Sequence, residues 1–193
     1  MPHVNKSQFA PIDLSDDWPT LLLLAEEREQ QKRGFGTSKL LRGAASTHLI
    51  GLAGECALAK ITGKPFDAKL RINGDGGKDF GEVDVKTSTY WPPILKHPVN
   101  PKFWPKWFSL VYFDEASKQA FFIGTVSKEE LLSGPRRTFN QAAGEQHSLD
   151  CEAVAAYSRA HLERRRQKQA ALQGPSFTTC GSPKPARTSK VAH

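Results

Sequence analysis

The segment from Asn73 to Thr89 constrains the chain most, because it joins a glycine-rich stretch to a strand with alternating charges. It reads NGDGGKDFGEVDVKTST. The alternation that begins at residue 82 predicts a strand with Asp84 and Lys86 on one face and Val83 and Val85 on the other. The apolar face can pack into a core. The row of charges behind a glycine-rich turn indicates a functional site on the opposite face.

Two carboxylates and a lysine in this segment suit metal-assisted phosphodiester chemistry. We expect Asp79 to open one strand, and Asp84 and Lys86 to share a face of the next. Carboxylate oxygens bind Mg²⁺, which keeps several waters and sits beside substrate phosphates. Such an ion lowers the pKa of a water and neutralises charge on the phosphoryl oxygens. The lysine can orient the attacking water or balance the developing charge. The segment therefore predicts a Mg²⁺ site, which Mn²⁺ can also fill.

This arrangement also resembles a known family. Asp79, then Asp84-x-Lys86, with Glu55 upstream in a predicted helix, is similar to the PD-(D/E)xK, restriction-endonuclease-like nuclease superfamily. Within it, the chain most resembles small phage and archaeal members related to Holliday junction resolvases, over about residues 45–126. The sequence departs from the pattern in two ways: the residue before the first acid is Lys, not Pro, and the second acid is Asp, not the commoner Glu.

The resemblance implies a fold and a set of roles. The fold is α/β, with a mixed central β-sheet flanked by helices. Asp79, Asp84 and the backbone carbonyl of Val85 would bind the metal ion. Glu55 would complete the site, or reach the ion through a water. Lys86 would position and activate the attacking water. A solvated hairpin with alternating salt bridges is the alternative explanation of the same pattern, and in that case Glu55 points to solvent.

Composition limits the class of protein. The chain has 193 residues, enough for one domain with a core and tails. It contains no apolar run near the length of a membrane span, and its start lacks a signal-peptide pattern. The three cysteines, Cys56, Cys151 and Cys180, are widely spaced and have no zinc-ligand spacing. We therefore expect a reduced, cytoplasmic protein without a membrane partner.

The net charge of +7 is concentrated at the C-terminal end. Residues 159–193 carry eight basic side chains and one acidic side chain, which accounts for the whole excess. Arg164, Arg165 and Arg166 form the densest group. A basic tail on a neutral domain predicts contact with the phosphate backbone of DNA. A purely solubilising tail is the equally weighted alternative.

Residues 90–107 combine five prolines with three of the four tryptophans and three lysines. The prolines argue against a helix or a regular strand, so we expect a long loop. Aromatic rings interleaved with lysines can stack bases and hold phosphates. On this interpretation Trp91, Lys96, Lys102 and Lys106 contact nucleic acid. The alternative is a loop pinned by its aromatic residues over the edge of the sheet.

The remaining patterns predict the order of elements and the domain limits. We expect an N-terminal extension with one helix at 1–37, a nuclease-like α/β domain with a C-terminal helix at 38–172, and a disordered basic tail at 173–193. Residues 1–14 are expected to be poorly ordered and 135–148 to form a loop. Helices are expected at 18–32, from 38 or 46 to 62, after Ser127, and at 149–172; strands are expected at 66–72, from 79, and at 84–89, 108–113 and 119–126.

These expectations define three functional hypotheses. The first is a metal-dependent endonuclease that hydrolyses phosphodiester bonds in DNA, in a phage or recombination setting. The second is a DNA-binding accessory protein on a nuclease fold that does not cut. The third is a phage factor that binds a host protein. The substrate stays open among junctions, duplexes, damaged DNA and RNA, and so does a homodimer.

Overall fold

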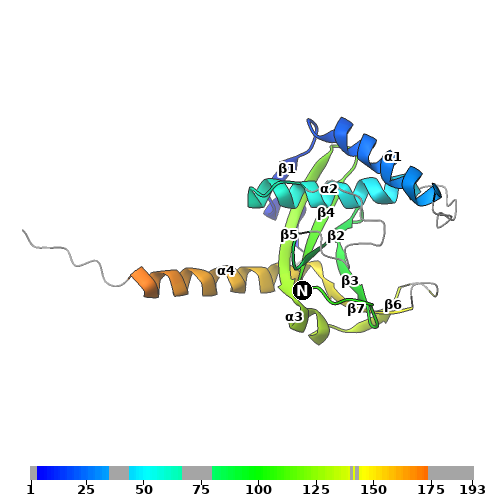
Figure 1. Cartoon of the computed structure of the whole chain (residues 1–193). Coiled ribbons are helices and arrows are strands. Elements are labelled where there is room, and N and C mark those ends of the chain that lie inside the picture. Colours follow the sequence, from blue (N-terminus) through cyan, green and yellow to red (C-terminus); the bar gives the residue numbers. More distant parts are fainter. Residues whose placement is uncertain (1–3, 35–43, 67–79, 140, 142–143, 174–193) are drawn as a thin grey trace, which may run out of the picture.

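The computed structural model describes residues 4–34, 44–66, 80–139, 141 and 144–173. In those residues the protein is a mixed α/β structure with four α-helices and two β-sheets (Figure 1). None of the described helices is both long enough and apolar enough to span a membrane. The elements are η1 (Lys6–Gln8), β1 (Pro11–Asp13), α1 (Trp18–Gly34), α2 (Ala44–Thr62), β2 (Val83–Ser88), β3 (Ile94–Pro98), β4 (Trp107–Asp114), β5 (Gln119–Ser127), α3 (Lys128–Ser133), β6 (Arg136–Thr138), β7 (Glu145–Asp150) and α4 (Cys151–Gln173).

The larger sheet has four strands in the order β1-β5-β4-β2. It is mixed, because β2 runs parallel to β4 whereas the β4–β5 and β5–β1 pairs are antiparallel. The second sheet is antiparallel in the order β3-β7-β6 and lies on the far side of the larger sheet from α1 and α2 (Figure 1). The coarse prediction of a mixed sheet flanked by helices is confirmed. The second sheet was not predicted.

Helices α1 and α2 cover one side of the four-stranded sheet and form what we call the α2 core. Leu21 and Ala25 of α1 and Leu52 of α2 are almost fully buried there. Helix α2 approaches β2 closely at Gly54, where an added Cβ would lie 1.9 Å from Thr87 Oγ1. Gly63, with a φ of +65°, ends α2 in the left-handed conformation that glycine adopts without strain.

A second cluster, which we call the α4 core, lies between the two sheets and the first half of α4. Leu95, Phe108, Leu149 and Val154 are buried in it, and they come from four different elements. Helix α3 borders this core and begins, as predicted, after Ser127. Its first turn is a capping box, in which the side chains of Ser127 and Glu130 each accept a hydrogen bond from the other residue's backbone N–H.

Helix α4 lies along β5 where that strand extends past its short partner β1. The backbone N–H of Thr125 donates to Ser158 Oγ at 3.2 Å, so a side chain of the helix satisfies a donor on β5. The close approach needs Gly124, because a Cβ there would lie 2.6 Å from the Cβ of Ser158. Beyond this contact the helix projects away from the body of the protein (Figure 1), and residues 162–172 are exposed.

Most predicted elements of the described residues are confirmed. Helices α1 and α2, strands β2, β4 and β5, and helix α3 lie at the predicted positions. Helix α4 begins at Cys151, two residues later than predicted, because Leu149 and Asp150 end β7. The predicted strand at 66–72 falls within residues 67–79, apart from Phe66, which belongs to no helix or strand. The predicted strand from 79 was wrong where it can be checked, because Phe80 forms only an isolated bridge to Val83 and residues 81–82 are the turn between them. Residues 67–79 and 174–193 lie outside the described residues.

Three predictions of irregular structure were wrong. Residues 4–14 are ordered, since β1 pairs with β5 and Leu14 is completely buried. The proline-rich segment contains β3, which tolerates its terminal Pro98 because β3 lies at the edge of its sheet. Residues 135–148 contain β6 and most of β7. All of these strands are short, and they depend on partners distant in sequence more than on local propensity.

Candidate active site

Asp84 and Lys86 share one face of β2, as predicted, while Val85 points the other way into the α2 core. The Asp84 side chain is 4% exposed, and its Oδ2 lies 2.8 Å from Lys86 Nζ. The Lys86 side chain is 38% exposed. The pair therefore joins a buried carboxylate to a lysine that reaches solvent.

A histidine of the second sheet lies beside this pair. His97 of β3 is buried, and its Nδ1 is 3.8 Å from Asp84 Oδ2. Its ring packs against the rings of Trp104 and Phe108, with centroid separations of 4.8 Å in both cases. Trp104, from the segment before β4, and Phe108 of β4 thus hold the histidine ring in place next to Asp84.

The electrostatic environment keeps His97 neutral. Burial, the charge of Lys86 and the neighbouring His147 lower the pKa of His97 to about 4. His147 is the direct partner of His97 across the β3–β7 ladder and is also buried. Within the described part of the chain, both ring nitrogens of His97 and Nδ1 of His147 are buried without a hydrogen-bond partner. Such groups cost stability and tend to mark functional sites.

The sequence did not identify these two histidines as site residues. His97 lies 13 positions after Asp84, and His147 lies 50 positions after His97. They meet only because β3 pairs with β7, and neither strand was predicted. The local signal for β3 is an alternation: Leu95 and His97 are buried, whereas the residue after each of them is exposed.

Glu55, predicted as the helical ligand, lies in α2 beside an arginine. Arg28 of α1 donates two hydrogen bonds to its carboxylate, at 3.4 and 3.3 Å. Both side chains are 14% exposed. Glu55 therefore does not simply point to solvent: its charge is balanced by a cation that links α1 to α2. Helix α2 also covers the Val85 face of β2, opposite the face that carries Asp84.

Two further predicted ligands can be located only in part. Asp79 lies outside the described residues. The chain resumes at Phe80, which bridges to Val83 across a two-residue turn whose Gly81 has a φ of +70°. Phe80 therefore lies beside the first residue of β2. Val85, whose carbonyl was the predicted third ligand, pairs in register with Ser109 of β4.

The described residues do not form a complete metal site by themselves. No three His, Cys, Asp or Glu side chains among these residues converge on a common metal position. Mg²⁺ is usually held by one or two carboxylates and keeps several waters, so it does not require three such side chains, and Asp84 can supply one. A structural zinc ion would need four nitrogen or sulfur ligands, and the described residues contain no such group.

The predicted nucleic-acid residues of the 90–107 segment are mostly engaged within the protein. The Trp91 ring makes edge contacts with Phe9 and Tyr112, at centroid distances of 6.1 and 5.1 Å. This packing matches the alternative of a segment pinned by its aromatic residues. Two aromatic rings that the sequence did not single out are instead free on the surface: Tyr90 is 82% exposed and Phe103 is 62% exposed.

The predicted basic contacts differ in their surroundings. Lys96 Nζ lies 3.9 Å above the Phe139 ring, and Lys106 Nζ pairs with Glu82 at 2.8 Å. Lys102 is solvent-exposed.

In α4 the three arginines are also exposed. Arg164 contacts Glu130 at 3.8 Å and His161 at 3.0 Å. Arg165 faces a cavity, and Arg166 projects from the helix. The three arginines therefore form no single surface.

Comparisons with protein-family models, with curated proteins and with solved structures give no significant match. A functional assignment therefore depends on the residues and contacts described above.

Proposed function

We propose that the protein is a metal-dependent endonuclease that hydrolyses phosphodiester bonds in DNA, on a restriction-endonuclease-like core. The observation that carries the proposal is the Asp84–Lys86 pair. Burying a carboxylate costs free energy, and such buried charges are frequent at functional sites, so the burial of Asp84 near the start of β2 supports a functional role. A lysine that touches it and also reaches solvent can act on a substrate phosphate at the same place.

In this proposal each residue of the face has one task. Asp84, together with Asp79 and the carbonyl of Val85, would hold Mg²⁺. The ion, when bound, activates a water and neutralises charge on the phosphoryl oxygens. Lys86 Nζ would donate a hydrogen bond to the attacking water or to the developing oxyanion. His97, which is neutral near pH 7, packs beside Asp84 and restricts the orientation of its carboxylate.

DNA would be held by groups outside this face. The exposed arginines of α4 and Lys102 can neutralise phosphates, and the exposed rings of Tyr90 and Phe103 can stack on unpaired bases. Arg166 projects from α4 and can reach a part of the DNA beyond the cleavage position. Arg164, which contacts Glu130, and Arg165, which faces the cavity, would contact DNA nearer the body of the protein.

A second candidate is a DNA-binding accessory protein that does not cut. The observation that favours it is the Arg28–Glu55 pair, because a glutamate that is already neutralised by arginine is a poorer metal ligand. In that case DNA affinity would fall steeply with salt and would not depend on Mg²⁺ or on Asp84→Asn.

The decisive experiment measures cleavage of supercoiled plasmid, linear duplex, single strand and a four-way junction with Mg²⁺, Mn²⁺ or EDTA. Lys86→Ala is compared with Lys118→Ala, a lysine substitution in the turn between β4 and β5. We expect metal-dependent cutting that Lys86→Ala abolishes and Lys118→Ala retains. The substrate that is cut fastest would define the subfamily. DNA binding without cutting under any metal would overturn the nuclease proposal and favour the accessory protein.

A further inference from the structure

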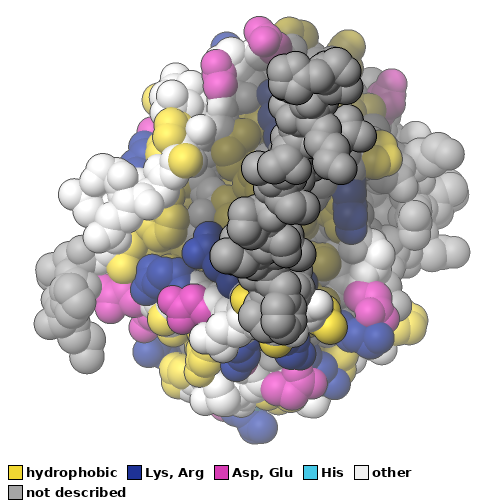
Figure 2. Space-filling model, turned by 90° about the vertical axis from the view of Figure 1, so that its left-hand side faces the viewer, with side chains coloured by type: hydrophobic (Ala, Val, Ile, Leu, Met, Phe, Trp, Pro, Cys, Tyr) yellow, Lys and Arg dark blue, Asp and Glu magenta, His cyan; other side chains and the backbone are white. Residues whose placement is uncertain are grey.

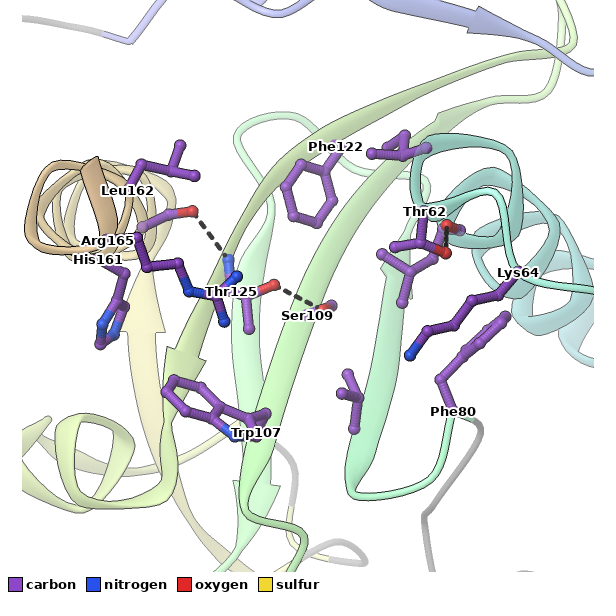
Figure 3. A pocket seen from close by; sticks show the side chains of 14 residues that line it. Thr62, Lys64, Phe80, Trp107, Ser109, Phe122, Thr125, His161, Leu162 and Arg165 are labelled. Atoms are coloured by element: carbon purple, nitrogen blue, oxygen red, sulfur yellow. Dashed lines mark hydrogen bonds between the residues drawn. The ribbon is translucent and has the colours of Figure 1, made fainter. Parts of the chain in front are cut away.

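A cavity of about 490 Å³ lies over one face of the four-stranded sheet (Figure 3). This is the face opposite Asp84, because Val83 lines the cavity and neighbouring residues of a strand point to opposite faces. Its floor is the sheet face that carries Val83, Ser109 and Phe122. One wall is the end of α2 with the residues that follow it, and the other wall is the middle of α4. The volume is in the range of small-ligand sites, which run from about 300 to 1,000 Å³.

The fold leaves this space open because two helices cover the sheet from different edges. Helix α2 packs over β2 through Gly54, and α4 is fixed to β5 through Ser158 and Gly124. Between them, no helix of the described residues covers the parts of β4 and β5 that carry Ser109 and Thr125. Close contacts of each helix with the sheet, at Gly54 and at Gly124, therefore fix the two walls of the cavity.

Among the described residues, the two charged side chains that line the cavity, Lys64 and Arg165, are both positive. Lys64 points into it from the end of α2, and Arg165 points into it from α4, on the opposite side (Figure 3). No Asp or Glu lines it among the described residues. The third titratable group, His161, is hydrogen-bonded at 2.9 Å to Glu130, which is not part of the lining. Figure 2 views the side to which α4 points and shows Lys and Arg side chains next to hydrophobic ones on that face.

The rest of the lining is mostly apolar, and hydroxyl groups at the floor make it weakly polar there. The indole of Trp107 stands at one end and the ring of Phe122 at the other (Figure 3). Between them, Ser109 Oγ and Thr125 Oγ1 are 2.8 Å apart and share one hydrogen bond. The pair leaves one hydroxyl hydrogen and several lone pairs that can bond the edge of a ligand.

We propose that this cavity binds a nucleotide, with the base over the apolar floor and the phosphate between Lys64 and Arg165. Aromatic rings such as Trp107 and Phe122 can stack on a base, and arginine and lysine bind phosphate by charge-assisted hydrogen bonds. The nucleotide can be free or can be an unpaired residue of a DNA strand. A free nucleotide site is independent of the nuclease proposal, whereas the strand version rests on it.

The test measures binding by calorimetry in EDTA, on an Asp84→Asn background, so that the result does not depend on cleavage. The probes are AMP, dTMP, a five-residue thymidine oligonucleotide and inorganic phosphate. Lys64→Ala and Arg165→Ala remove the two cations, and both side chains are exposed enough to be replaced without disturbing a core. Arg159→Ala, another exposed arginine of α4 that does not line the cavity, is the matched control.

We expect at least one nucleotide probe to bind, with an affinity that falls about tenfold or more in Lys64→Ala and in Arg165→Ala and is retained in Arg159→Ala. Binding of AMP or dTMP would identify a free nucleotide as the ligand. Binding of the oligonucleotide alone would identify a strand. Equal affinity for inorganic phosphate would overturn the nucleotide site, as would the absence of binding or an equal loss in Arg159→Ala.

Discussion

The two sides of the four-stranded sheet use the same strand for different purposes. Toward α2, strand β2 presents Val85 to the apolar α2 core, and Gly54 lets the helix approach closely. Toward the second sheet, it presents Asp84 to a space that also buries His97 and His147. Both sides gain stability from apolar burial, since the α4 core also lies toward the second sheet, but only the second side also buries Asp84, His97 and His147, which costs stability. The candidate chemistry lies on the side that buries these polar groups.

The strongest test of this contrast replaces Asp84 and, for comparison, the exposed Glu82 in the turn just before β2. Asp84→Asn keeps the size of the side chain but removes the charge that would hold Mg²⁺. We expect the cleavage rate to fall by at least about 100-fold. Glu82→Gln is the control, because the Glu82 side chain is 49% exposed and pairs with Lys106 at the surface. Equal losses in both variants, measured under the same Mg²⁺ concentration, would mean that burial of Asp84 has no special role.

Thiol labelling compares how tightly the two cores are closed. Cys56 lies in the α2 core and Cys151 in the α4 core, and both are buried. Burial, assisted by nearby carboxylates, raises the pKa of both thiols to about 11. In a Cys180→Ser background at pH 8, we expect both to react more than about 100-fold slower than in denaturant, because thiolate is the reactive form.

The labelling rate should also rise as the pH approaches 11, because more of each thiol is then ionised. Mass spectrometry of the labelled peptides distinguishes the two sites. If Cys151 reacted fast at pH 8 and Cys56 did not, the side that carries the polar groups would be the one that opens.

Two glycines of α2 provide a stability test of the apolar side. Gly54→Ala places a Cβ 1.9 Å from Thr87 Oγ1, so we expect a loss of about 1–3 kcal/mol in the free energy of unfolding. Gly51→Ala meets no atom within 4 Å, and alanine is the better helix former, so we expect a gain of up to about 1 kcal/mol. Chemical denaturation measures both. A loss of stability in Gly51→Ala as well would show that propensity, not packing, decides.

The same contrast explains how much could be predicted from sequence. Strand β2 and helix α2 were predictable because their side chains repeat with the period of their own secondary structure. The placement of Asp84 and Val85 on opposite faces of β2 was predictable for the same reason. Strands β3, β6 and β7 were not, because they are short and depend on each other across gaps in the sequence.

The candidate site follows the same division. The Asp84–Lys86 pair is local and could be read from the sequence. The contact of His97 with Asp84 depends on the fold, as does the pairing of Glu55 with Arg28, since each joins residues from separate elements. Local patterns therefore predict which charged residues share a face of one strand or helix, but not which side chains of other elements contact them.

The smallest expected effect concerns Glu55, which the family resemblance would assign to the metal. The double substitution Arg28→Met with Glu55→Met removes both charges of a mostly buried pair together. Replacement of such a pair by apolar residues is often neutral, so we expect a change within about 1 kcal/mol in unfolding and an unchanged Mg²⁺ dependence of cleavage. Cleavage at a series of Mg²⁺ concentrations checks this. A large loss of activity with intact stability would show that Glu55 leaves Arg28 when the metal binds, and that the active site draws on both sides of the sheet.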